Sequence, residues 1–332
     1  MRGTAREIFH RLALKGERLT DRLKPDPAGT RVIDPYMGYS THEHLILRGR
    51  VLTESRQRAA RPDTGPVSNF RDMLSLFMTD EVAGVTAESG GVTTVTDEEG
   101  YYTLTLPRPE TTGWTQVTVN LPDYGVSAVN HAFVPDASAE LMIISDIDDT
   151  VLKTNAWSLV RNLWTSLTGS VLSREIHEDA RSLIAGLSGN GRNPVYYVSS
   201  SPWNMHAFLD MIFERTGLTR GPMFLRDLGL SDTKLITEGH GSHKGGSIRQ
   251  LLEAHPGLTT VLLGDTGQKD SEIYAGVVHD YPGRVSAVVL RETDDGSDDA
   301  DTGPMAEMRR NGVVVFHGPR FPDPAEVASE IL

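Results

Sequence analysis

The feature that most constrains the fold is a series of apolar segments after residue 140, which alternate with helix-like stretches. The apolar segments are LMIIS (141–145), VYYVSS (195–200), TTVLLGD (259–265), VSAVVLR (285–291) and VVVF (313–316). Strands that are apolar on both faces and separated by helices are typical of a parallel sheet with helices on both faces. The sequence therefore predicts an α/β domain over 139–332, and ligands of such sheets bind at the carboxyl ends of the strands.

The region before residue 139 has a different pattern of residues. Short β-branched segments between residues 40 and 138 are separated by turn residues, as in HLILRGRVL, YYTLTLP and TQVTVNL. This pattern is typical of antiparallel strands, so we expect a small antiparallel β-sandwich domain over 40–138. The segment TTVTDEEGYYTLTL further predicts a hairpin with its turn at Asp97–Gly100.

Residues 1–30 are expected to form a separate, basic N-terminal helix over about 4–24. Residues 1–31 hold eight Lys or Arg and four Asp or Glu, with a partial apolar stripe formed by Ile8, Leu12, Leu19 and Leu23. Such a segment either docks on the body of the protein as a helix, lies on a membrane surface or stays disordered, and the sequence leaves all three open.

Composition excludes several classes of function. The chain has no cysteine, so disulfides, thiolate metal sites and cysteine nucleophiles are ruled out. A net charge of −13 disfavours nucleic-acid binding. We find neither a GxxxxGK[ST] phosphate loop nor a GxSxG elbow. With no apolar signal segment or membrane-spanning stretch, we expect a cytoplasmic chain, with peripheral membrane association as the alternative.

Polar side chains gather where the predicted parallel strands end. The first strand is followed by Asp146-Ile147-Asp148-Asp149-Thr150. Several carboxylates at one strand end repel each other, and a bound cation offsets that repulsion. Because the ligands are hard oxygens, Mg²⁺ suits them better than Zn²⁺. A carboxylate can also attack phosphorus, and a second one can serve as general acid and base.

Three later segments complete this set. The second strand ends in three serines, Ser199–Ser201. A serine hydroxyl and the backbone N–H groups at a following helix start suit a phosphate oxygen. Lys244, one of only six lysines, begins a predicted helix and can neutralise phosphate. A further strand ends in Asp265, which can complete a metal site, and Asp270 follows five residues later.

Taken together, the motifs SDIDDTVLKT, YYVSSSPWN, Lys244 and LLGDTGQKDSEIY resemble the four ordered motifs of the haloacid dehalogenase superfamily. They are most similar to the catalytic domain of the actin-patch-associated phosphatidate phosphatases, a lipin-related family, over roughly residues 140–292. The resemblance implies a doubly wound, parallel, Rossmann-like sheet of the haloacid dehalogenase type, preceded by the β-sandwich and the N-terminal helix.

The resemblance also implies roles for individual residues. Asp146 would be the nucleophile, Asp148 the general acid and base, and Lys244 the neutralising cation, with Lys234 as its alternative. The phosphate would be bound by Ser199 or Ser200 and by Thr150. Magnesium would be bound by Asp146, Asp148 and Asp265, supported by Asp270 and Lys269.

The implied reaction is Mg²⁺-dependent hydrolysis of a phosphomonoester through an aspartyl-phosphate, with phosphatidate as the implied substrate and lipid metabolism as its setting. Only about 40 residues separate SSSPWN from Lys244, too few for a large cap domain, so bulky substrates would be admitted. The apolar stripe of residues 157–167 (Trp157, Val160, Leu163, Trp164, Leu167) is either a flap over the site or a helix packed on the core. We expect peripheral membrane contact through residues 4–24, Trp157 and Trp164. The alternatives are a phosphatase of a soluble monoester and a non-catalytic interaction protein.

Overall fold

The computed structural model describes residues 30–53, 81–153, 176–226, 240–267, 269–292 and 299–331. The expected N-terminal helix, the apolar stripe of residues 157–167 and Lys234 lie outside these ranges. Among the described residues, no helix combines the length and the apolar character needed to cross a bilayer.

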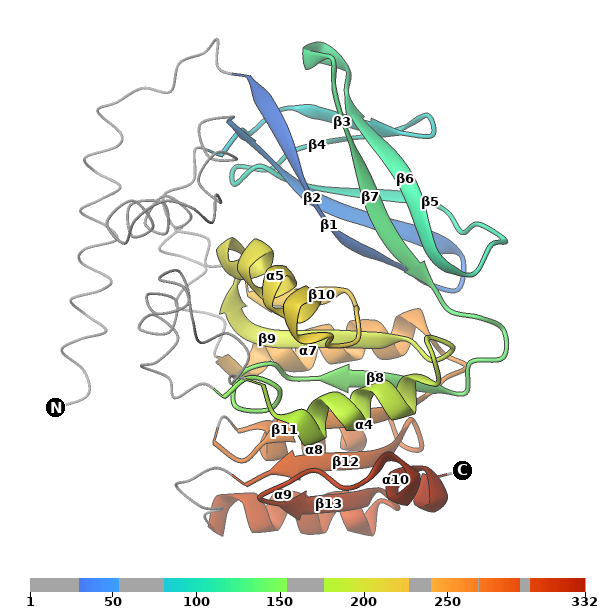
Figure 1. Ribbon diagram of the computed structural model, residues 1–332, viewed down its shortest axis with the longest axis vertical. Helices are drawn as coiled ribbons and strands as arrows, with labels where there is room; N and C mark the ends of the chain where they lie inside the picture. Colours follow the sequence, from blue (N-terminus) through green and yellow to red (C-terminus); the bar gives the residue numbers. More distant parts are fainter. Residues whose placement is uncertain are drawn as a thin grey trace, which may run out of the picture.

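The first part of the chain forms one seven-stranded sheet, drawn in blue and green at the top of Figure 1. Its strand order is β4-β3-β6-β7-β1-β2-β5. Most neighbours are antiparallel, but β1 runs parallel to β7, with Gly38 opposite Ala132. The strands are β1 (Arg31–Ser40), β2 (His44–Thr53), β3 (Thr86–Ser89), β4 (Val92–Val95), β5 (Tyr101–Pro107), β6 (Gly113–Leu121) and β7 (Val126–Val134).

This sheet curls until its two edge strands, β4 and β5, approach each other. The side chains on its inner face, among them Leu47, Leu104 and Val119, are fully buried and form a core of their own. A nearly closed sheet therefore covers its apolar face with itself, without a second sheet stacked on it.

The rest of the chain forms a six-stranded sheet in the order β10-β9-β8-β11-β12-β13, parallel throughout. Helices α4, α5 and α10 pack on one face, and α7, α8 and α9 pack on the other. The strands are β8 (Leu141–Ser145), β9 (Val195–Pro202), β10 (Met223–Arg226), β11 (Thr259–Asp265), β12 (Val285–Arg291) and β13 (Val314–Gly318). The helices are α4 (Glu178–Ser188), α5 (His206–Thr216), α7 (His240–Ala254), α8 (Asp270–Asp280), α9 (Asp299–Arg310) and α10 (Pro324–Ile331).

The predicted fold class is therefore wrong for this chain. It named a doubly wound sheet of the haloacid dehalogenase type preceded by a small antiparallel sandwich. The chain instead begins with a mixed, nearly barrel-shaped sheet, and strand residues outnumber helix residues in the described part. Alternating apolar and polar residues show only that one face of a sheet is buried. A sandwich and a curled sheet satisfy this equally, so the pattern could not distinguish them.

The predicted hairpin is also wrong. The turn forms where expected, since Gly100 N–H donates to the Asp97 carbonyl over 3.0 Å. The strands on either side of it do not pair, because β4 pairs with β3 and β5 with β2. The local turn signal was correct, but the partner of β5 comes from a more distant part of the chain.

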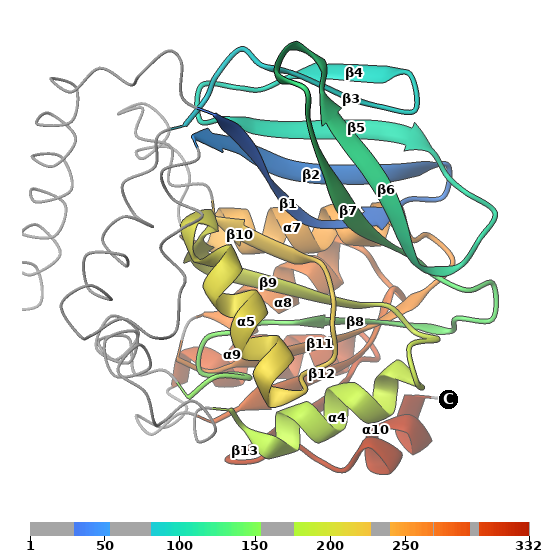
Figure 2. The ribbon, with the colours of Figure 1, turned by 45° about the horizontal axis from the view of Figure 1, so that its top comes forward.

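The two sheets meet along β1 and β2 (Figure 2). Tyr36 of β1 stacks on Trp203, which directly follows β9, with ring centres 4.6 Å apart and planes 11° apart. Arg48 of β2 donates to the Met223 carbonyl of β10 over 3.0 Å, and the Gln250 amide of α7 donates to the Tyr39 hydroxyl over 2.7 Å. The curled sheet is thus attached directly to the strands and helix that surround the carboxyl end of β9.

Candidate active site

Asp146 lies immediately after β8, and its side chain is buried. Its backbone N–H donates to the Leu263 carbonyl of β11 over 2.8 Å, which continues the ladder between the two strands. The Thr150 hydroxyl donates to Asp146 Oδ2 over 3.1 Å. Both the backbone and the carboxylate of Asp146 are therefore fixed by the strand end and by the turn that follows it.

Lys244, in α7, is the cation of the site. Its ammonium lies 2.9 Å from Asp146 Oδ1 and also forms an ion pair with Asp270. The side chain is only 2% exposed, so its charge depends on these two carboxylates. Burial alone would lower the pKa of Lys244, but the pairing with Asp146 and Asp270 raises it above its ordinary value.

Asp265 ends β11 and is fully buried. Its Oδ1 accepts a hydrogen bond of 2.6 Å from the Gly267 N–H. Burial, followed by the neighbouring charge of Asp270, raises the pKa of Asp265 to about 7, although Lys244 opposes this rise. Burial likewise raises the pKa of Asp146 well above its ordinary value, against the influence of Lys244.

Asp270 begins α8 and connects the parts of the site. Its Oδ2 accepts from the Asp265 N–H over 3.2 Å and lies 3.4 Å from the Tyr274 hydroxyl. That hydroxyl also donates to the Leu263 carbonyl over 2.8 Å. The close approach requires glycine at position 264, because a Cβ there would lie 2.4 Å from Asp270 Oδ2.

Asp146, Asp265 and Asp270 together fit a metal ion. Ligand atoms of the three carboxylates lie within 4.8 Å of one another, and all three side chains are buried. When all three carboxylates are ionised, Lys244 neutralises one of the negative charges and two remain. Asp265 Oδ2 is buried and has no hydrogen-bond partner among the described residues. An orphaned carboxylate oxygen beside uncompensated negative charge suits a hard divalent cation.

Asp148 and the serines of β9 form a second group beside the carboxylates. Asp148 Oδ2 accepts hydrogen bonds from the Ser199 hydroxyl over 2.7 Å and from the Ser201 hydroxyl over 2.9 Å. Ser200 lies between them in the strand, so its side chain points to the opposite face. Of the two serines expected to bind phosphate, the structure brings Ser199 to Asp148.

Not every expected residue reaches the site. The Lys269 side chain is 76% exposed and lies 4.0 Å from Glu272, so it does not join the buried carboxylates. Sequence reasoning also missed three neighbours. Ser201 was identifiable only as part of the serine run. Tyr274 appeared only within the quoted motif, and Gly264 had no recognisable signal because its role depends on what approaches its Cα.

The turn after Asp146 is fixed by Arg291, which ends β12. The Arg291 guanidinium makes two hydrogen bonds to the Asp179 carboxylate, of 2.8 and 3.2 Å, and its Nε lies 3.4 Å from the Thr150 carbonyl. Asp179 lies in the first turn of α4, so this partly buried ion pair connects the turn to the helix packed beneath it.

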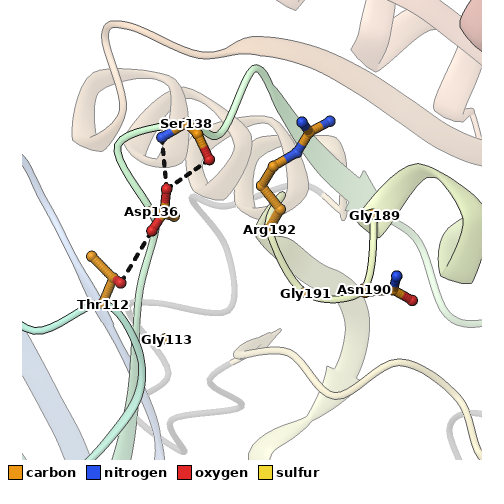
Figure 3. Close-up of a pocket in the computed structure, with 8 residues that line it drawn as sticks. All are labelled: Thr112, Gly113, Asp136, Ser138, Gly189, Asn190, Gly191 and Arg192. Atoms are coloured by element: carbon orange, nitrogen blue, oxygen red, sulfur yellow. Dashed lines mark hydrogen bonds between the residues drawn. The ribbon is translucent and has the colours of Figure 1, made fainter.

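A cavity of about 390 Å³ lies away from these residues (Figure 3). Residues of the linker before β8 and of the turn between α4 and β9 line it, including Asp136, Ser138 and Arg192. It therefore opens near the amino ends of β8 and β9, at the opposite edge of the parallel sheet. The Asp136 carboxylate accepts hydrogen bonds from the Thr112 and Ser138 hydroxyls. The lining of the cavity has no group of buried carboxylates around a lysine like the one at the carboxyl ends.

Comparison with known proteins points to the part of the chain that holds the buried carboxylates and Lys244. Residues 141–292 match the family model described as the catalytic domain of phosphatidate phosphatase APP1. That range contains every side chain of the site described above. The prediction that the chain carries a phosphatase domain is confirmed by this match.

Two curated proteins are similar to a stretch of this chain of comparable length. Uncharacterized protein C29B5.04c of Schizosaccharomyces pombe is 26% identical over 153 residues, which is 46% of this chain and 25% of that protein. Phosphatidate phosphatase APP1 of Saccharomyces cerevisiae is 24% identical over 149 residues, 45% of this chain and 25% of that protein. The match thus spans about a quarter of the length of these relatives.

Proposed function

We propose that this chain is a Mg²⁺-dependent phosphomonoesterase that acts through an aspartyl-phosphate on Asp146, the chemistry of the haloacid dehalogenase superfamily. One observation carries the proposal: Lys244 is buried between Asp146 and Asp270, with Asp265 beside them. Three segments far apart in sequence contribute these side chains, with Asp265 and Asp270 coming from the same one. A purely structural ion pair would not need the two additional negative charges.

In the first half-reaction, a carboxylate oxygen of Asp146 attacks phosphorus while the bond from phosphorus to the ester oxygen breaks. The departing oxygen keeps the bonding electron pair and takes a proton from Asp148. Lys244 neutralises Asp146. The hydroxyls of Thr150 and Ser199, which donate to Asp146 and Asp148 in this structure, would turn to the phosphate oxygens. Water then attacks the aspartyl-phosphate and gives a proton to Asp148. This step releases phosphate and restores the Asp146 carboxylate.

Mg²⁺ would be held by the carboxylates of Asp146 and Asp265 and by the backbone carbonyl of Asp148, while Asp270, which is paired with Lys244, supports the site. When bound, it supplies Lewis-acid polarisation of the phosphate and neutralises developing charge. The positive charge of a bound cation would offset the burial that raises the pKa of Asp146 and so favour the ionised nucleophile.

As substrate we propose phosphatidate, converted to diacylglycerol and phosphate. Support comes from the match of residues 141–292 to a phosphatidate phosphatase catalytic domain. A soluble phosphomonoester is the competing substrate, and the two differ in whether hydrolysis depends on a lipid surface.

The test measures phosphate release from a panel of esters, including phosphatidate in mixed micelles and soluble sugar and nucleotide phosphates, with and without Mg²⁺. We expect release from phosphatidate that stops when EDTA removes the metal. Asp146→Asn should abolish turnover while leaving the circular dichroism spectrum unchanged. Asp123→Asn, which makes the same change at an exposed position, is the control. Near-normal turnover by Asp146→Asn would refute the mechanism, and efficient hydrolysis of soluble esters alone would refute the substrate.

A further inference from the structure

Two serine hydroxyls converge on one oxygen of Asp148, although binding a phosphate requires only one of them. Ser199 lies 2.7 Å and Ser201 lies 2.9 Å from Asp148 Oδ2. The two serines are separated by one residue of β9, so they share a face of the strand, and both are buried. The second hydroxyl therefore needs an explanation of its own.

Ser201 is held more firmly than a loop residue would be. Its backbone N–H donates to the Ser199 hydroxyl oxygen over 2.9 Å. Two residues later, Trp203 stacks on Tyr36 of the curled sheet. The hydrogen bond to Ser199 and the stacking of Trp203 on Tyr36 thus fix the end of β9. The Ser201 hydroxyl therefore reaches Asp148 from a fixed backbone. Such a fixed donor is suited to holding a carboxyl group in one orientation.

We propose that Ser201 is a positioning residue for the general acid, whereas Ser199 is the serine that turns to the phosphate. A carboxylic acid that protonates a leaving group must present the oxygen that carries its proton. With Ser201 donating to Oδ2, that oxygen is committed as an acceptor, and the transferable proton lies on Oδ1. The proton then moves from Asp148 Oδ1 to the ester oxygen as its bond to phosphorus breaks, and the electron pair of that bond stays on the oxygen.

This role rests on the proposed function. It also predicts a dependence of the rate on the leaving group, which a role in phosphate binding does not predict. A poor leaving group, such as an alkoxide, needs the proton as it departs. A good leaving group, such as a nitrophenolate, departs with little help. Loss of orientation at Asp148 should therefore slow alkyl phosphates selectively, whereas loss of a phosphate ligand should slow both classes.

The experiment compares an alkyl phosphate with 4-nitrophenyl phosphate for four variants of the full chain with Mg²⁺. For Ser201→Ala we expect kcat on the alkyl ester to fall about 10- to 100-fold, within the range of general acid catalysis. On the aryl ester kcat should change by less than about 2-fold, and KM should stay unchanged for both esters. Ser201→Thr, which keeps the hydroxyl, should restore most of the alkyl rate. Ser199→Ala should impair both esters.

Ser286→Ala is the matched control, because Ser286 lies at the other end of the same sheet, where its hydroxyl bonds the Thr260 carbonyl. It should leave both rates unchanged. Equal losses on the two esters in Ser201→Ala, or an unchanged alkyl rate, would overturn the positioning role while leaving the phosphatase itself intact. If the unmodified chain hydrolyses neither of these esters nor phosphatidate in mixed micelles, the proposed function is overturned, and the role of Ser201 with it.

Discussion

At the scale of single residues, each charged side chain of the site is stable in its buried position only because its oppositely charged partners are present. Lys244 is nearly inaccessible to solvent and is paired with both Asp146 and Asp270. Burying an ion is costly unless its partners are also present. The three side chains therefore depend on each other for stability, in addition to any part they take in catalysis.

Replacing the lysine tests this dependence. Lys244→Met leaves two buried carboxylates without their cation, so we expect it to lower the free energy of unfolding by about 3–5 kcal/mol and to abolish phosphate release. Urea unfolding followed by circular dichroism measures the first effect. Lys153→Met, at an exposed position, should change the stability by less than about 0.5 kcal/mol. A stable Lys244→Met variant would mean that the carboxylates are not ionised in the folded protein.

Much of the site could be predicted at this scale because its residues stand at strand ends or helix starts that are visible in the sequence. Asp146 and Asp265 directly follow apolar runs, and parallel strands bring their carboxyl ends to one edge. The choice between Ser199 and Ser200 could not be made, since one residue of register decides which face a side chain takes. Lys269 was placed in the site because of its motif, yet its side chain is directed to solvent.

At the scale of elements, the site depends on how closely α8 approaches the end of β11. Gly264 has no side chain, and this allows the Asp270 carboxylate and the Tyr274 hydroxyl to lie against the strand backbone. A Cβ at position 264 would lie 2.4 Å from Asp270 Oδ2 and 2.7 Å from the Tyr274 hydroxyl. Both distances are shorter than van der Waals contact.

A single methyl group added at position 264 should therefore push α8 away from the end of β11. Gly264→Ala is expected to displace Asp270 from Lys244, to destabilise the protein by about 1–3 kcal/mol through overpacking, and to reduce phosphate release at least as strongly. Thermal unfolding and the same activity assay measure the two effects. Gly257→Ala makes the same change where no heavy atom lies within 4 Å and should be nearly neutral. If both variants behave alike, the packing of α8 on β11 does not position Asp270.

The strand pairings show where element-level prediction fails. The turn at Asp97–Gly100 is local and was predictable from its residues. The partner of β5 is not local: β5 pairs with β2, and Leu104 lies opposite Leu47, 57 residues earlier in the chain. Nothing in a short window of sequence encodes such a partner. The same limit explains the wrong expectation of a sandwich, which requires the order of strands as well as their number.

At the scale of the whole molecule, the two sheets share a junction built around Arg48. Its guanidinium donates to the Met37 and Met223 carbonyls and lies over the rings of Tyr39, Trp203 and Phe224. These partners come from both sheets. Arg48 is therefore expected to couple the stability of one sheet to that of the other.

Arg48→Met keeps the apolar stem of the side chain and removes its charge and its hydrogen bonds. We expect a loss of about 2–4 kcal/mol in the free energy of unfolding, from lost charged hydrogen bonds and ring contacts. We also expect weaker protection of β9 and β10 from amide hydrogen exchange. Arg192→Met, which removes an exposed ion pair of 3.5 Å with Glu140, should cost less than about 0.5 kcal/mol. An effect confined to β1 and β2 would show that the sheets unfold separately.

Acid sensitivity is a second property of the whole molecule. Burial lowers the pKa of His255 to about 4, and its ring contacts the Tyr196 hydroxyl at 2.6 Å. Between pH 4 and the unfolded value of about 6.5, the unfolded chain binds a proton that the folded chain does not. Stability should therefore fall as the pH falls through this window.

His255→Gln removes this titration. In urea unfolding measured from pH 7.5 to 5, the slope of unfolding free energy against pH should be shallower in the variant by up to about 1.4 kcal/mol per pH unit. His279→Gln, which changes a histidine in α8, serves as the comparison. Parallel slopes for the unmodified chain and His255→Gln would mean that folding does not lower the pKa of His255.

The junction also has a consequence for the order of events during synthesis. Arg48 and the Met223 carbonyl that it binds are 175 residues apart in sequence. At ribosomal rates of about 5–20 residues per second, roughly 10–35 s pass between the emergence of the one and the other. The curled sheet can bury its own core in that interval, but Tyr36, Tyr39 and Arg48 must wait for partners that have not yet been made. For that period the nascent chain presents an aromatic, cationic face to its surroundings, which is the kind of surface that chaperones bind.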